Sequence, residues 1–212
     1  MYIPPAFAER DIAKLHAFIE TYAFAAVVSN GPEGLVATHL PVLLERDRGP
    51  FGTLVVHFAR ANPHWKALDG ADVLAIFQGP NGYVSPSWYA THPAVPTWNY
   101  AVVHAYGRAR MVNDDARLRD IVVRLTEKYE AGRARSWTVD SVPEQFMSSM
   151  LKGTVGVEIE LTRIEGKLKL SQNRSAADRR NVIAALAQSG NAEDRALADY
   201  MARHAPPPSE PS

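Results

Sequence analysis

The chain has 212 residues, of which 46% are hydrophobic and 22% charged, a composition typical of one globular domain with a sizeable core. Its 23 Lys and Arg residues balance its 23 Asp and Glu residues, so no excess charge attracts a polyanion, which disfavours a general nucleic-acid coat. The absence of cysteine excludes disulfides, thiolate chemistry and cysteine-ligated metal sites.

The first half of the chain predicts one helix followed by short strands. Apolar residues at helical spacing predict an amphipathic helix within residues 9–22. Strand-like runs follow at residues 24–29, 35–45, 53–59 and 71–78. In the second of these runs, Pro41 favours a sheet edge or a bulge. Asn62 and Pro63 are typical of the cap and first turn of a short helix. The stretch Gly79–Gly82 predicts a tight turn, after which Tyr83 begins a new strand and residues 101–112 form another.

After residue 112 the pattern changes to helical spacing. Residues 114–130 place an apolar stripe on one face behind the acidic pair Asp114 and Asp115, which favours a helix. Further helices are expected at residues 142–152, 175–190 and 191–204, with a strand at 154–171 before the last two. Strands joined by short turns, with helices at the ends, favour a mainly β fold with appended helices, built as a closed antiparallel barrel. We expect one domain over residues 1–190 with helical insertions, a C-terminal helix at 191–204 and a disordered tail at 205–212.

No catalytic motif is evident, so no catalytic residue is assigned. The sequence contains neither a phosphate-binding glycine loop, nor a serine-hydrolase elbow, nor a zinc-protease helix. A metal site built from His39, His57 and His104 is conceivable, but isolated strand histidines are more often ordinary core groups, and nothing fixes the spacing that ligands require.

Polar residues gather where the expected strands begin or end. Thr38 and His39 interrupt an apolar strand. Arg60 and Asn62 stand between a strand and a short helix, where a cation beside free helical N–H groups is suited to a phosphate. The alternative for this pair is an exposed arginine and an ordinary asparagine cap.

Two aromatic runs and one basic run complete the candidate site. Ser85–Tyr89 and Pro96–Tyr100 combine Trp and Tyr with hydroxyl and amide groups, a set that suits a planar heteroaromatic ring, although protein interfaces use the same residue types. Residues 167–175 are rich in donors and leave a strand to enter a helix, so they suit a phosphate or a ring carbonyl, or else a solvated strand end. The donors of this run are Lys167, Lys169, Ser171, Gln172, Asn173 and Arg174.

Six segments together resemble the PaiB family of FMN-binding negative transcriptional regulators. They are MYIPPAF, GLVATHLPVLL, HFARANPHW, FQGPNGYVSPSWY, VPTWNYAVVHAYG and KLKLSQNRSAADR, and the likeness extends from residue 1 to about residue 190. The family implies a split β-barrel related to pyridoxamine phosphate oxidase and flavin reductases, in which two subunits pack together and bind flavin between them. The run Arg60-Ala61-Asn62 departs from the longer Ser-Arg-Lys pattern of the oxidases.

The resemblance implies FMN as cofactor and a homodimer as the assembly. Together with the polar and aromatic runs it assigns nine residues to the cofactor: Thr38, His39, Arg60, Asn62, Ser85, Trp98, Asn99, Lys169 and Gln172. Arg60 and Lys169 would supply charge to the phosphate, and Trp98 and Asn99 would face the isoalloxazine. We therefore expect Trp98→Phe and Asn99→Ala to leave the stability of the ligand-free protein almost unaltered.

The family label also implies regulation of transcription, which the residues themselves support less. No helix-turn-helix is evident, and the basic residues between Arg163 and Arg180 are interleaved with Glu165 and Asp178, so DNA binding is implied by the label alone. A flavin-dependent oxidoreductase and a haem-binding split barrel stay open as alternatives. The start of the chain does not resemble a signal peptide and no apolar window would span a membrane, so we expect a soluble, cytoplasmic protein.

Overall fold

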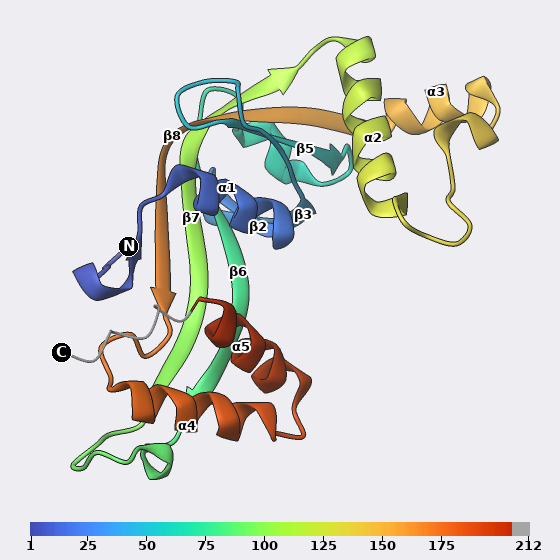
Figure 1. Cartoon of the computed structure of the whole chain (residues 1–212). Helices are drawn as coiled ribbons and strands as arrows, with labels where there is room; N and C mark the ends of the chain where they lie inside the picture. The colour runs from blue at the N-terminus through green and yellow to red at the C-terminus, as the bar shows by residue number, and fades with distance from the viewer. Residues whose placement is uncertain (205–212) are drawn as a thin grey trace. The chain divides into compact units, whose positions relative to one another are not determined.

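Three long strands carry the fold of the computed structural model, which describes residues 1–204 (Figure 1). They are β6 (Asp72–Val84), β7 (Thr97–Val112) and β8 (Thr154–Lys169). Each strand contributes residues to two compact units. Unit 1 contains Met1–Asp11, Gln78–Val103 and the described residues from Glu165 onward, and unit 2 contains Ile12–Phe77 and His104–Ile164. The tail expected to be disordered, at 205–212, lies outside the described residues.

Unit 2 is a mainly antiparallel sheet with helices. Its strands follow the order β3-β2-β6-β7-β8-β5-β4. Besides its parts of the three long strands, it contains α1 (Ile12–Thr21), β2 (Phe24–Gly31), β3 (Gly34–Pro41), β4 (Leu43–Glu45), β5 (Thr53–Ala59), the short 3-10 turns η2 (Pro63–Ala67) and η4 (Val139–Ser141), α2 (Asp115–Glu130) and α3 (Glu144–Lys152). The expected mainly β architecture with appended helices is confirmed.

Helix α2 packs against strands β4 and β5. Asp114 caps the helix by accepting the backbone N–H of Ala116 over 3.1 Å, as its acidic start predicts. The apolar stripe of α2 then buries Ile121 and Leu125 against Leu43 and Val55. This contact anchors the helix through hydrophobic burial.

An ionic network surrounds the same contact. Glu45, at the end of β4, accepts hydrogen bonds from Arg48, Arg117 and Arg124. Glu158 on β8 accepts from Arg48 and Arg117. Burial by itself raises the pKa of Glu45, but the hydrogen bonds from Arg124, Arg48 and Arg117 outweigh it and hold the pKa at about 2.

Unit 1 contains its parts of the three long strands together with two helices. Strand β1 (Ala8–Glu9) joins the edge of β8, with Ala8 opposite Lys167. Helices α4 (Ala176–Ala187) and α5 (Ala192–Arg203) lie side by side (Figure 1). Two 3-10 turns, η1 (Pro5–Phe7) and η3 (Pro86–Trp88), complete the unit.

The stretch Gly79–Gly82 corrects a sequence prediction. It continues strand β6 instead of forming a tight turn, and Ser85 then caps η3 instead of extending a strand. A Cβ at Gly82 would lie 2.9 Å from Leu197 Cδ2 and 3.0 Å from Asp194 Oδ1. The glycine lets α5 approach the strand closely, since a Cβ there would force the ends of the Leu197 and Asp194 side chains to shift. A local turn pattern does not reveal this long-range contact.

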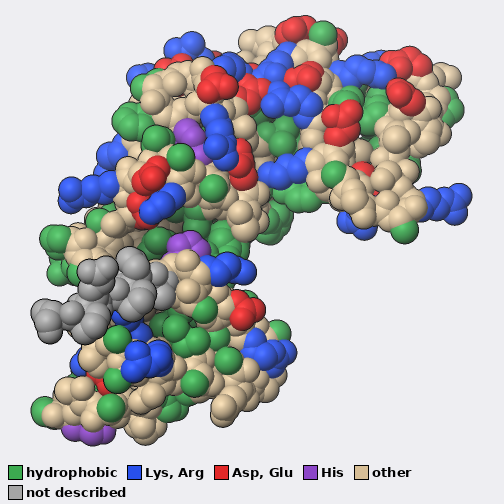
Figure 2. Space-filling model, viewed as in Figure 1, with side chains coloured by type: hydrophobic (Ala, Val, Ile, Leu, Met, Phe, Trp, Pro, Cys, Tyr) green, Lys and Arg blue, Asp and Glu red, His purple; other side chains and the backbone are tan. Residues whose placement is uncertain are grey.

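The face of unit 2 seen in Figure 2 carries charges of both signs side by side over α2 and α3. Arg119 on α2 and Glu144 on α3, for example, form an ion pair of 2.9 Å. The described part of the chain has no helix that is both long enough and apolar enough to span a membrane.

Candidate functional site

Two of the residues assigned to the cofactor meet in unit 2, where Asn62 Nδ2 donates to Thr38 Oγ1 over 3.2 Å. The imidazole of His64 lies beside them, with Nδ1 2.8 Å from Thr38 Oγ1 and Nε2 2.9 Å from Ser29 Oγ. Asn62 also accepts the backbone N–H of His64 at Oδ1, over 3.0 Å. These four residues are the Thr38 cluster. The sequence analysis missed His64 and Ser29. The two residues are 35 positions apart, and the residues around each of them do not indicate that the side chains meet.

The local sequence explains how the cluster assembles. In the antiparallel pair of β2 and β3, Val27 is opposite Thr38 and Ser29 is opposite Val36, so Ser29 and Thr38 are diagonal neighbours on one face. Asn62 and Pro63 start η2 in the way that the sequence predicts, and the Asn62 cap directs His64 toward that face.

The cluster is nearly closed to water around His64. The side chain is 3% exposed, and the ring of Phe58 meets it edge-on with centroids 5.6 Å apart. Burial lowers the pKa of His64, so the imidazole is neutral near pH 7. One ring nitrogen then carries a proton and donates, while the other accepts.

Arg60 and His39 lie near the Thr38 cluster in the sequence but make other contacts. Arg60 donates from Nε to the carbonyl of Lys152 over 2.6 Å and from Nη2 to that of Thr154 over 3.0 Å. The guanidinium thus satisfies carbonyl groups where α3 ends and β8 begins. His39 is exposed on the other face of β3 from Thr38 and stacks against Phe24 at 6.2 Å.

A second group of assigned residues lies in unit 1, around the start of β7. The indole of Trp98 is 54% exposed and meets the half-exposed ring of Tyr83 edge-on at 6.1 Å. Beside it is an open hollow of about 300 Å³ lined by Gln78, Asn81, Trp98, Tyr100, Ala101 and Val102. Two amides and two aromatic rings around one hollow fit the faces and edge of a planar heteroaromatic ring.

Asn99 points away from this hollow. Its side chain is 1% exposed, with Nδ2 donating to Ser171 Oγ over 2.9 Å and lying 3.5 Å from Met201 Sδ on α5. Its Oδ1 atom is buried and has no hydrogen-bond partner among the residues that the structure describes. Successive residues of a strand face opposite sides, so Trp98 and Asn99 cannot contact one face of the same ring.

The other assigned residues of unit 1 are engaged locally. Lys169 donates to the hydroxyl of Thr97, and burial lowers the pKa of its ammonium group. Gln172 bonds back to the loop, donating to the carbonyl of Leu168 and accepting the backbone N–H of Leu170. Ser85 caps η3 by accepting the backbone N–H of Ser87 over 3.2 Å. Of these three, Lys169 brings a positive charge that a phosphate would stabilise.

Two basic residues of this region, Lys167 and Arg174, lie against aromatic rings. Arg174 lies over Tyr89 at 4.5 Å, and Lys167 lies near both Tyr2 and Tyr100 at 5.6 and 5.2 Å. Such cation–π contacts hold the charges against the protein surface.

The histidines considered for a metal do not gather. Among residues 1–204, no three His, Asp or Glu side chains lie close enough to hold a metal ion. His57 is mostly buried in β5, which lowers its pKa, and its Nδ1 makes no hydrogen bond within the described part of the chain.

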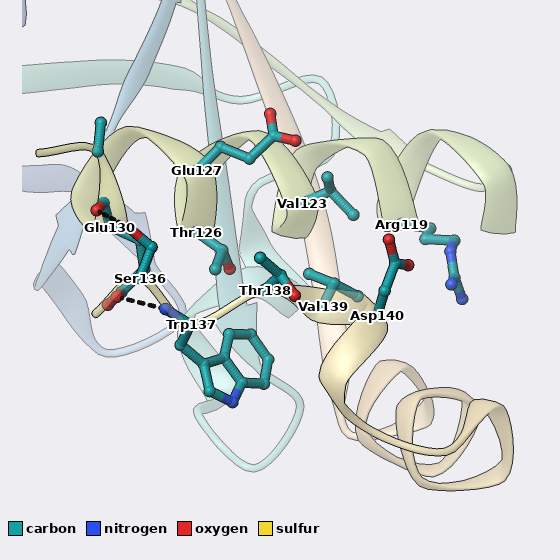
Figure 3. Close-up of a pocket in the computed structure, with 11 residues that line it drawn as sticks. Arg119, Val123, Thr126, Glu127, Glu130, Ser136, Trp137, Thr138, Val139 and Asp140 are labelled. Carbon is teal, nitrogen blue, oxygen red and sulfur yellow. Dashed lines mark hydrogen bonds between the residues drawn. The ribbon is translucent and has the colours of Figure 1, made fainter. Parts of the chain in front are cut away.

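A separate hollow of about 330 Å³ lies in unit 2 between α2 and residues 136–140 (Figure 3). Glu130 fixes its rim by accepting the backbone N–H of Trp137 over 2.9 Å, while its carbonyl accepts the Ser136 hydroxyl over 3.0 Å. None of the nine residues assigned to the cofactor lines this hollow.

Comparison with known sequences identifies relatives over most of the chain. The family model described as "Putative FMN-binding domain" matches residues 1–163. The "Protease synthase and sporulation protein PAI 2" of Bacillus subtilis is 37% identical over 202 residues, which cover 95% of this chain and 96% of that one.

Comparison with solved structures identifies the fold. The "FAD and Heme binding protein" of Mycobacterium smegmatis superposes with a TM-score of 0.58 and 20% identity, covering 84% of this chain and 79% of the other. The flavocytochrome Anf3 of Azotobacter vinelandii gives a TM-score of 0.57 and 17% identity, covering 76% and 69%. At this identity the likeness concerns the fold alone, which is the split barrel that the sequence resemblance implies.

Proposed function

We propose, because the chain belongs to the PaiB family of FMN-binding proteins, that it is a cytoplasmic, homodimeric negative regulator of transcription with FMN as its cofactor. The observation that carries the proposal is the likeness to the Bacillus subtilis protein, which spans nearly the whole length of both chains. The name of that relative refers to protease synthesis and sporulation. The family membership includes the FMN-binding domain, whereas the regulatory role and the dimer are inferred.

The chemistry of two groups of residues fits FMN, and each is proposed as a contact in its own right. In unit 2, the hydroxyl of Thr38 and the amide of Asn62 provide neutral hydrogen-bonding groups for a ligand oxygen. In unit 1, Trp98, Tyr100 and the amides of Gln78 and Asn81 surround the open hollow, and Lys169 supplies a cation. FMN, when bound, provides reversible electron transfer, while these residues bind and orient it.

The cofactor is tested on the purified, full-length protein. We expect the absorption bands of a flavin, or their appearance with a saturable shift when FMN is added to colourless protein. A Soret band would support the haem-binding alternative instead. A protein that neither carries nor binds FMN would contradict the proposal at its first step.

The regulatory role needs a separate measurement, because FMN binding alone does not test binding to DNA. Genomic fragments are incubated with the full-length protein with and without FMN, and bound fragments are footprinted. Protection of a discrete operator, altered by FMN, supports a regulator that binds DNA directly. Turnover of a nicotinamide cofactor well above that of free FMN, without any footprint, would favour the oxidoreductase alternative.

A further inference from the structure

The Thr38 cluster contains an unusually complete hydrogen-bond chain around a buried histidine. Ser29, His64, Thr38 and Asn62 follow one another through contacts of 2.9, 2.8 and 3.2 Å. They come from β2, η2, β3 and the turn before η2, so no single element holds them. Burying several polar groups costs free energy unless all are paired, and here both ring nitrogens of His64 have partners.

The direction of one hydrogen bond in the chain is fixed by the backbone. Asn62 Oδ1 accepts the N–H of His64, which can only donate, so the amide nitrogen of Asn62 faces Thr38 and donates to its oxygen. Thr38 Oγ1 has one further acceptor position and one proton left for its contact with His64 Nδ1.

The neutral imidazole therefore decides where the Thr38 proton points. If Nδ1 is the accepting nitrogen, the Thr38 hydroxyl donates its proton to His64 and cannot donate to a ligand. If Nδ1 carries the proton, it donates to Thr38 Oγ1, which then accepts two hydrogen bonds and directs its own O–H outward. In the second arrangement Nε2 accepts from the Ser29 hydroxyl. Ser29 is 4% exposed, and its Oγ makes no other hydrogen bond within the described part of the chain, so its proton is satisfied only when it donates to Nε2. Ser29 therefore favours the tautomer that frees the Thr38 proton.

We propose that His64 is a positioning residue for the cofactor: with Ser29 behind it, it holds the Thr38 hydroxyl as an outward donor to an oxygen atom of FMN. The inference rests on the proposed role of Thr38 in FMN binding. His64 itself makes no hydrogen bond to the ligand in this arrangement, because both of its nitrogens are occupied within the cluster.

The competing explanation is that His64 only fastens the β2–β3 pair to η2. Stability alone cannot separate the two roles, since either predicts a less stable variant. A double-mutant cycle can separate the two roles. If His64 acts through Thr38, replacing His64 has no further effect on FMN affinity once Thr38 has been replaced.

The experiment measures FMN dissociation constants by flavin fluorescence for the full-length wild type, Thr38→Val, His64→Phe and the double variant. Phenylalanine keeps a flat ring against Phe58 and removes both nitrogens. We expect each single change to weaken FMN about three- to tenfold, the range of one neutral hydrogen bond. The double variant should bind no more weakly than Thr38→Val alone.

Two further variants keep the test decisive if His64→Phe does not fold. Ser29→Ala removes the partner of Nε2 without touching Thr38, so it should weaken FMN about twofold or more in the wild-type background and not at all beside Thr38→Val. The control is His16→Phe: His16 is also buried, at 7% exposed, and donates from Nε2 to the carbonyl of Phe51 over 2.9 Å, remote in sequence from every assigned residue. It should lower stability and leave FMN affinity unchanged.

The outcomes separate this inference from the function on which it rests. The positioning role is overturned if the effects of Thr38→Val and His64→Phe are additive. It is also overturned if Thr38→Val leaves FMN affinity unchanged, or if His64→Phe and Ser29→Ala both do. In each case the protein still binds FMN. A wild type that does not bind FMN overturns both.

Discussion

Trp98 and Asn99 are neighbours in the chain that face opposite sides of strand β7, with 54% of Trp98 exposed and 1% of Asn99. We therefore expect the two residues to differ in role, with Asn99 contributing to stability and Trp98 to FMN binding. The expectation that Asn99→Ala leaves the ligand-free protein unaltered conflicts with the burial of its amide against Ser171 and α5.

We now expect Asn99→Ala to destabilise the FMN-free protein by about 0.5–1.5 kcal/mol, the worth of its hydrogen bond to Ser171. Denaturant unfolding of the ligand-free protein measures this loss. Unchanged unfolding would mean that the buried, unpartnered Oδ1 already cancels the contribution of the hydrogen bond.

Trp98→Ala should behave in the opposite way. The melting temperature without FMN should change little because the indole is half exposed, whereas the thermal shift caused by FMN should fall, since that shift tracks affinity. Trp137→Ala is the matched control, because Trp137 is 45% exposed and lies beside the other hollow. An equal loss of the FMN shift in both variants would remove the special role of Trp98.

The proposed homodimer predicts that light scattering gives twice the 23.3 kDa mass of the chain at micromolar concentration. The exposed aromatic pair of Tyr83 and Trp98 motivates this expectation, since such pairs are enriched in interfaces. Tyr83→Asp should then raise the dissociation constant of the dimer, because a charge in an apolar contact must be desolvated. A monomeric wild type would contradict the prediction directly.

Lys169 and Arg60 are both assigned to the phosphate of FMN. Riboflavin lacks this phosphate, so comparing the two ligands tests each assignment. Lys169→Met should weaken FMN about ten- to a hundredfold and leave riboflavin almost unaffected, as a charge-assisted contact is worth about 1.5–3 kcal/mol. Arg60→Ala should reduce thermal stability as well, because it also releases the carbonyls of Lys152 and Thr154. Calorimetric titration with both ligands provides the comparison, and equal losses for FMN and riboflavin would show that neither cation contacts the phosphate.

Acid should unfold the protein partly through Glu45. Its pKa is lowered from 4.5 to about 2, so the stability it contributes is present above about pH 4.5 and disappears as the pH falls toward 2. The stability difference between wild type and Glu45→Gln should therefore shrink over that window in denaturant titrations. Glu20→Gln, which removes a partly exposed carboxylate whose hydrogen-bond partner among residues 1–204 is Arg46, should show a weaker effect.

Local chemistry made much of the fold predictable. The strand at 53–59 matches β5, and the caps at Asn62 and Asp114 form as their residue types indicate. Each depends on neighbours within four residues, which the sequence displays directly. The turn expected at Gly79–Gly82 was wrong, because its glycine accommodates α5 from more than a hundred residues later.

For the candidate site, the sequence predicted the types of residue better than the directions in which their side chains point. Thr38 and Asn62 meet, yet His39, Gln172 and Arg60 turn to other partners, since a strand alternates its faces and a loop can fold its side chains back on itself. His64 and Ser29 escaped notice because their contact depends on the register of β2 against β3. Register follows from packing of the whole sheet and leaves little local trace.

The passage of β6, β7 and β8 through both units has a genetic consequence. Unit 1 is assembled from three separate stretches of the gene and unit 2 from two, so neither can be copied, exchanged or expressed by moving one contiguous piece of coding sequence. A stop codon placed after residue 164 would delete both helices of unit 1 and the end of β8 while leaving residues 78–103 without them. Recombination can therefore graft a new segment before or after this protein far more readily than it can trade one of its halves.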